Sequence, residues 1–131
     1  MRNLITGGAG FIGSHLAEEL LDKGEEVVVV DNLSTGNMDN VAHLKSDPGF
    51  SVHVDTIMNE ALMRRLIGEC DRIFHLAAAV GVKYIIDNPL DSLQTNVNGT
   101  EIVLKLANEL GKKKVILAST SEIYEGPSGQ A

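Results

Sequence analysis

Three glycines set the strongest limit on how this sequence can fold. Residues 3–6 have the apolar character of a buried strand, and residues 11–21 carry apolar side chains at helical spacing. Gly7, Gly10 and Gly13 lie at and beyond the junction between these two segments. At such a junction the first glycine permits a tight turn, the second lets the backbone approach a pyrophosphate, and the third lets the helix pack closely. The spacing therefore predicts a dinucleotide-binding turn at the start of a helix.

Strand-like and helix-like segments alternate along the rest of the sequence. Gly24 is expected to end the first helix, which begins near Phe11. The predicted strands are residues 3–6, 27–30, 51–54, 72–76 and 114–118, and the later helices are residues 59–67 and 89–111. Strands that alternate with helices form a parallel sheet covered on both faces. We expect a single α/β domain over residues 1–131, a three-layer, doubly wound, Rossmann-type sheet of about five parallel strands.

An acidic residue follows the second predicted strand. Asp31 lies 18 residues after Gly13. In dinucleotide-binding folds a carboxylate about 20 residues beyond the glycines hydrogen-bonds the adenosine ribose. Its charge would repel a ribose 2′-phosphate, and residues 31–44 contain no Lys or Arg to offset the repulsion. The sequence therefore favours NAD over NADP as the cofactor.

Composition excludes several other classes of protein. The chain has 11 Lys and Arg against 18 Asp and Glu, a net charge of −7, which argues against nucleic acid as a partner. Cys70 is the only cysteine, and His15, His43 and His53 lack the spacing of metal ligands, so we expect no disulfide and no metal site. No apolar run reaches 18 residues, which predicts a cytoplasmic chain without a membrane segment. His75 ends a predicted strand and is interpreted as structural.

Five short motifs occur in an order that is typical of one family. They are Thr6-Gly-Gly-Ala-Gly-Phe-Ile-Gly13, Asp31-Asn32, His75-Leu-Ala-Ala78, Asn96-Val-Asn-Gly-Thr100 and Ser119-Thr-Ser-Glu-Ile-Tyr124. Over residues 1–126 the chain resembles the NAD-dependent epimerase/dehydratase family, extended short-chain dehydrogenases that act on nucleotide sugars. The resemblance implies a nucleotide-sugar substrate for the parent enzyme and NAD as the cofactor.

The resemblance also assigns cofactor contacts along the chain. Pyrophosphate contacts fall on Gly7, Gly10, Phe11, Ile12 and Gly13, and ribose contacts on Asp31 and Asn32. Asp55 matches an adenine-contacting acid with Thr56 beside it, while Leu76, Ala77 and Ala78 pass under the cofactor. Asn96 matches a helix asparagine that holds the active-site framework, and Ser119 lies where the fifth strand ends, at the edge where ligands gather.

The same resemblance implies catalytic roles near the end of the sequence. Family members oxidise a sugar hydroxyl, usually at C4, by transferring hydride to NAD. Thr120 matches the residue that hydrogen-bonds the reacting oxygen, and Ser121 and Glu122 follow it. Ser121 stands where dehydratases carry an acid, which counts against dehydration. The motif is similar to that of UDP-glucuronate decarboxylases and of some epimerases, and both reactions remain open.

The family's catalytic Tyr-x-x-x-Lys pair is missing from these residues. Tyr84 is followed four positions later by Asn88, and Tyr124 by Ser128. We therefore expect the N-terminal part of a longer enzyme, ending before the second half of the fold and the substrate domain, and inactive alone. The resemblance implies self-association, because family members dimerise through two helices per subunit and residues 88–110 would include one of them. The alternative is a stand-alone NAD-binding sensor or regulatory module, and a complete enzyme using Glu122 and Thr120 ranks below both.

Overall fold

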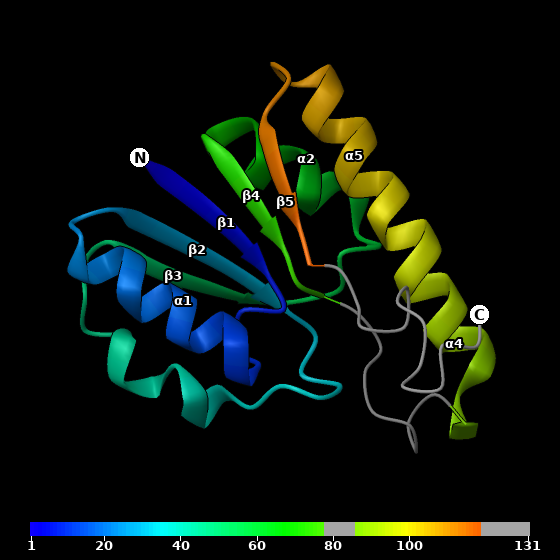
Figure 1. Ribbon diagram of the computed structural model, residues 1–131, viewed down its shortest axis with the longest axis horizontal. Coiled ribbons are helices and arrows are strands. Elements are labelled where there is room, and N and C mark those ends of the chain that lie inside the picture. The colour runs from blue at the N-terminus through cyan, green and yellow to red at the C-terminus, as the bar shows by residue number, and fades with distance from the viewer. Residues whose placement is uncertain (78–85, 119–131) are drawn as a thin grey trace, which may run out of the picture.

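The computed structural model describes residues 1–77 and 86–118, and these contain a parallel five-stranded sheet (Figure 1). The strands are β1 (Arg2–Thr6), β2 (Glu26–Asp31), β3 (Phe50–Val54), β4 (Arg72–His75) and β5 (Lys114–Leu117). Their order across the sheet is β3-β2-β1-β4-β5, and all four pairings are parallel. The predicted fold class is confirmed, and the predicted strand ends differ from the observed ones by a residue at most.

Helices cover the two faces of the sheet. On one face lies α1 (Phe11–Asp22), and on the other lie α2 (Glu60–Glu69) and α5 (Gly99–Glu109) (Figure 1). A short helix α4 (Pro89–Leu93) and a π-helical turn η3 (Gln94–Asn98) precede α5, and two 3₁₀ turns, η1 (Met38–Asn40) and η2 (Ala42–Leu44), lie between β2 and β3. The sequence predicted one helix over residues 89–111. Apolar spacing does not reveal the π-turn, because one widened turn shifts the helical phase without a change in composition.

The core is divided by the sheet. Neighbouring residues Leu4 and Ile5 of β1 are both fully buried, yet they belong to separate apolar clusters. Leu4 packs with residues of α2 and α5 such as Met63, whereas Ile5 packs with α1 residues such as Leu20. A strand that is buried on both faces is continuously apolar, and the run of valines in β2 shows the same pattern. This double burial fixes the register in which the strand ends meet.

Within residues 1–77 and 86–118, no helix has the length and apolar character needed to cross a membrane.

Candidate functional site

The glycine-rich turn lies where β1 ends, at the carboxyl edge of the sheet. Gly7 has a positive φ of 74°, and its N–H donates to the carbonyl of Val30 at 2.8 Å. A Cβ atom on Gly7 would lie 2.9 Å from the backbone nitrogen of Ala77, closer than a real Cβ can approach. Conformation and space therefore both require glycine here, and the turn is held against β2 and the end of β4.

Gly10 and Gly13 have different surroundings. A Cβ on Gly13 would lie 2.5 Å from the Gly7 carbonyl oxygen, because α1 packs directly on the turn. A Cβ on Gly10 would meet only that same oxygen, at 3.3 Å. Gly10 is the N-cap of α1, and the side chains of Phe11 and Ile12 in its first turn are 77% and 71% exposed. Uncovered backbone at a helix start, where N–H groups lack intrahelical partners, can accept an anion.

Asp31 lies beside this turn and is only 8% exposed. Its Oδ2 accepts the N–H of Ala9 at 2.9 Å, and its Oδ1 accepts the N–H of Leu33 at 2.7 Å. The carboxylate therefore joins the glycine turn to the segment after β2. Two hydrogen bonds leave acceptor capacity on both oxygens. The neighbouring Asn32 is exposed and accepts the N–H of Ser34 through its side chain.

Sequence reasoning missed the residues that hold Ala9. The Ala9 carbonyl accepts the N–H of Asn37 at 3.1 Å and the side-chain amide of Asn40 at 2.8 Å. A Cβ on Gly36 would lie 2.8 Å from Asp31 Oδ2 and 3.0 Å from the Ala9 carbonyl carbon. The loop after β2 thus packs against Ala9 of the glycine turn. Its composition of Asn, Gly and Ser is typical of a loop, but no local sequence pattern indicates where that loop packs.

Asp55 and Thr56 follow β3 at the same edge. The Asp55 N–H donates to the Asp31 carbonyl at 3.1 Å, which places these two acidic residues at adjacent strand ends. The Asp55 carboxylate accepts the N–H of Thr56 and the side-chain amide of Asn59, while the Thr56 hydroxyl accepts the N–H of Met58. The parallel sheet therefore gathers Gly7–Gly13, Asp31 and Asp55 along one edge.

The end of β4 is tied to the end of β1. The Thr6 hydroxyl accepts the N–H groups of Leu76 and Ala77 at 3.1 and 3.0 Å, which holds both residues beside the glycine turn. His75 is 3% exposed, and its ring contacts Thr6 on one side and Thr100 of α5 on the other. Burial lowers the pKa of His75 from its ordinary value of 6.5. The ring is therefore neutral near pH 7, in line with the structural interpretation.

The remaining predicted site residues are farther along the chain. Asn96 is an exposed residue of the π-turn η3, and its carbonyl accepts the Thr100 hydroxyl at 2.8 Å. Ala78, and the predicted catalytic and cofactor residues Ser119, Thr120, Ser121 and Glu122, lie outside the described residues.

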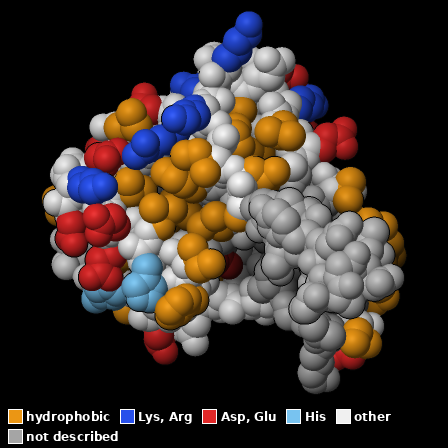
Figure 2. Space-filling model, viewed as in Figure 1, with side chains coloured by type: hydrophobic (Ala, Val, Ile, Leu, Met, Phe, Trp, Pro, Cys, Tyr) orange, Lys and Arg blue, Asp and Glu red, His pale blue; other side chains and the backbone are white. Residues whose placement is uncertain are grey.

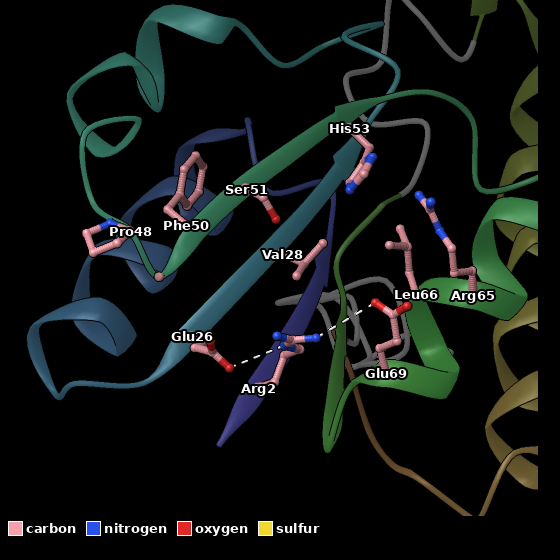
Figure 3. A pocket seen from close by; sticks show the side chains of 11 residues that line it. Arg2, Glu26, Val28, Pro48, Phe50, Ser51, His53, Arg65, Leu66 and Glu69 are labelled. Carbon is pink, nitrogen blue, oxygen red and sulfur yellow. Dashed lines mark hydrogen bonds and ion pairs between the residues drawn. The ribbon is translucent and has the colours of Figure 1, made fainter.

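A separate groove of about 300 Å³ lies on the sheet face between β3 and α2 (Figure 3). At its base Arg2 forms ion pairs with Glu26 at 3.3 Å and Glu69 at 3.7 Å, while His53 and Arg65 point toward each other at its other end (Figure 3). The base is formed by the first residues of β1 and β2 and by the last residue of α2. The groove therefore does not include the glycine turn, and the Arg2 guanidinium at its base is already paired with two carboxylates.

Neither a reactive cysteine nor a metal site is found among the described residues. Cys70 is 1% exposed within the α2-side core, and burial raises the pKa of its thiol to about 11. A thiol that stays protonated is a poor nucleophile. Among the residues of ranges 1–77 and 86–118, no three acidic, His or Cys side chains gather as a metal site would require.

This geometry agrees with a family-level match. The model of the family described as GDP-mannose 4,6 dehydratase matches residues 4–129. The chain belongs to the NAD-dependent epimerase/dehydratase family. The resemblance noted from the sequence motifs is thereby confirmed.

Named relatives in this family act on nucleotide sugars. A UDP-N-acetyl-alpha-D-glucosaminuronate decarboxylase of Bacillus cytotoxicus is 45% identical over 123 residues, which cover 94% of this chain and 37% of that protein. A solved UDP-glucose 4-epimerase of Thermus thermophilus in complex with NAD is 36% identical, with a TM-score of 0.78 over 92% of this chain and 38% of that one. A dTDP-glucose 4,6-dehydratase of Streptomyces venezuelae with NAD bound is 37% identical, with a TM-score of 0.82 over 88% and 38%. This chain therefore spans less than half the length of these relatives.

Proposed function

We propose that this chain binds NAD and forms the cofactor-binding part of a nucleotide-sugar epimerase or decarboxylase. One observation carries the proposal. The turn around Gly10 leaves its backbone uncovered at the start of α1, and the Asp31 carboxylate is fixed beside that turn by Ala9. Anion-accepting backbone next to a ribose-accepting carboxylate suits the diphosphate and the adjoining ribose of an adenosine diphosphate group. The NAD-bound relatives support the same assignment.

The residues present fit this cofactor. The first N–H groups of α1, at Phe11, Ile12 and Gly13, would hold the pyrophosphate, because they have no intrahelical partners. No acidic side chain lies in the first turn of α1 to repel it. Asp31 and Asn32 would hold the ribose, and Asp55 with Thr56 would lie beside the adenine.

The remaining cofactor and catalytic assignments stay proposals. Leu76, Ala77 and Ala78 would pass under the cofactor, Asn96 would hold the active-site framework, and Ser119 would lie at the sheet edge. When bound, NAD supplies an acceptor for the hydride removed from the sugar. Thr120 would hydrogen-bond the reacting sugar oxygen, with Ser121 and Glu122 beside it. Neither tyrosine of these residues is followed by a lysine four positions later, so we propose that the chain alone does not turn over.

Two further assignments belong to this proposal. A single, buried cysteine suits a reducing compartment, and we place the chain in the cytoplasm. We also expect a homo-oligomer, because apolar side chains remain exposed along α4 and α5.

Calorimetric titration with NAD⁺ and with NADP⁺ tests the cofactor proposal. We expect NAD⁺ to bind and NADP⁺ to bind more weakly, because the Asp31 charge repels the 2′-phosphate. Asp31→Asn keeps the size of the side chain but removes the charge, so it should weaken NAD⁺ binding about tenfold and narrow the difference between the two cofactors.

Asp39→Asn is the matched control, since it removes the same charge from an exposed residue of η1 in the same loop. It should leave both affinities unchanged. Equal affinity for NAD⁺ and NADP⁺ in the unmodified chain would contradict the assigned cofactor, and absence of NAD⁺ binding would reject the proposal.

A further inference from the structure

A chain of hydrogen bonds crosses the molecule from β1 to the π-turn through His75. The Thr6 hydroxyl accepts the N–H of Ala77 at 3.0 Å, and it shares the N–H of Leu76 with the Thr6 carbonyl, each at 3.1 Å. Its own proton is then left for Nδ1 of His75, 2.8 Å away. Nδ1 of His75 is therefore an acceptor, and the neutral ring carries its proton on Nε2.

The hydrogen bonds on the other side of the ring lead independently to the same tautomer. The Asn96 carbonyl can only accept, so the Thr100 hydroxyl at 2.8 Å must donate to it. Thr100 then accepts from Nε2 of His75 at 3.0 Å, which again requires the proton on Nε2. Every bond runs in one direction, from the N–H groups after β4 through Thr6, His75 and Thr100 to the π-turn.

The surroundings of the ring favour this neutral form. His75 is 3% exposed, and the side chains that its two nitrogens contact are both uncharged hydroxyls. A protonated ring would need an acceptor at Nδ1, where the Thr6 oxygen already receives two N–H groups. Desolvation disfavours the charged ring as well, and it is the cause of the lowered pKa of His75.

This series of hydrogen bonds begins and ends at two segments of the proposed site. One is the glycine turn assigned to the cofactor, and the other is the π-turn assigned to the active-site framework. Thr6 immediately precedes Gly7, and a Cβ on Gly7 would already collide with Ala77. At the other end, Asn96 lies in η3, and π-turns interrupt helices frequently at functional sites. The two ends belong to elements more than 80 residues apart in sequence, and His75 lies between them.

We propose that His75 is a positioning residue, which as the Nε2–H tautomer holds the π-turn at Asn96 in a fixed place relative to the glycine-rich turn. It does not contact the cofactor; it fixes the distance between two segments that together frame the cofactor. This inference rests on the proposed NAD-binding function. Without the hydrogen bonds from His75 to Thr6 and Thr100, here called the bridge, the two segments can move independently. NAD⁺ binding must then order them, and the entropy lost in doing so lowers the affinity.

Thr100→Val and Thr100→Ser form the test pair. Valine has a similar shape but no hydroxyl, whereas serine keeps the hydroxyl. At a temperature well below the melting of each variant, Thr100→Val should weaken NAD⁺ binding about fivefold, and Thr100→Ser should retain the affinity of the unmodified chain. A purely structural role would lower the melting temperature of Thr100→Val and leave the NAD⁺ affinity unchanged, and that result would overturn the proposal.

Nitrogen-15 NMR of the histidine ring provides a readout that does not need NAD. The unmodified chain should show His75 as the Nε2–H tautomer, and the amide signals of Gly7 and Ala77 should move in Thr100→Val but not in Thr100→Ser. An Nδ1–H tautomer, or unmoved amides, would refute the bridge even if NAD⁺ binds. If the unmodified chain binds no NAD⁺, the proposed function fails, whereas the tautomer and the amide signals still decide whether the bridge exists.

Discussion

The sequence motif gives Gly10 and Gly13 different roles, and their surroundings predict different effects of substitution. In Gly10→Ala the added methyl meets only the Gly7 carbonyl oxygen at 3.3 Å, so the fold should lose about 0.5 kcal/mol or less. The methyl would, however, occupy the space that a pyrophosphate needs. We expect NAD⁺ affinity to fall at least about tenfold while the urea midpoint stays nearly constant.

Gly13→Ala is the matched comparison. Its methyl would lie 2.5 Å from the Gly7 carbonyl oxygen and 2.7 Å from the Gly8 Cα, both backbone atoms. We expect the free energy of unfolding, measured with urea, to fall by about 1–3 kcal/mol because α1 must move away from the turn. A stable Gly13→Ala variant, or a Gly10→Ala variant that binds NAD⁺ normally, would contradict this assignment of roles.

His75 makes stability depend on pH in a definite direction. Burial lowers its pKa in the folded state below 6.5, so the unfolded chain takes up the proton first as the pH falls. The stabilising contribution is complete above pH 6.5 and is lost as the pH falls toward the pKa of the folded state. Urea titrations over this range should give a steeper loss of stability for the unmodified chain than for His75→Gln. Parallel pH profiles would show that His75 does not titrate in this way.

At the scale of elements, the helical segment from α4 to α5 leaves an apolar stripe uncovered. Exposed apolar side chains recur at helical spacing just before this segment, at Ile86, and along it, at Leu90, Leu93, Val97 and Leu104. They are 48–70% exposed, whereas Val103 and Leu106 on the opposite face are fully buried. A helix that is apolar on two sides has a second surface to bury.

We therefore expect reversible self-association through this stripe. Leu93→Lys places a charge on the stripe and should raise the dissociation constant of the assembly about tenfold in sedimentation equilibrium. Ser46→Lys places the same charge at an exposed position between η2 and β3, outside this helical segment, and it should associate like the unmodified chain. A monomer at micromolar concentration would refute the expected assembly.

At the scale of the whole molecule, the sheet is covered unequally. On the α1 side, α1 packs against β1 and β2, while Ile116 of β5 lies beside Phe74 of β4 and stays 36% exposed. Figure 2 shows hydrophobic side chains gathered in the middle of this view, over the sheet between α1 and α5. An apolar face next to an edge strand is prone to pairing with other chains.

At rising protein concentration, Ile116→Lys should scatter less light than the unmodified chain. A charge on an edge strand discourages pairing with other chains, so fewer assemblies larger than the one expected through the α4–α5 stripe should form. Ile116→Val keeps an apolar side chain and is expected to scatter light like the unmodified chain. If Ile116→Lys aggregates as readily as Ile116→Val, this face is not the one that associates.

Much of this architecture was predictable because it depends on neighbours in sequence. The glycine spacing, the β-branched run at 27–30 and the helix-ending Gly24 led to the confirmed order of elements. The position of Asp31 near the glycine turn followed from the same strand-turn-helix pattern, since the carboxyl ends of parallel strands meet at one edge. The π-turn at Gln94–Asn98 did not follow, because local propensity averages over several turns of helix.

The sequence alone determined the alternation of strands and helices, the glycine turn and the family motifs, because each depends on local backbone preferences over a few residues. Tertiary structure decided which distant groups meet: Asn40 on the Ala9 carbonyl, and His75 between Thr6 and Thr100. Those contacts join residues 25 to 69 positions apart, and they exist only when the strands hold one register. A buried polar side chain must find partners in the folded chain, and only the assembled sheet supplies them.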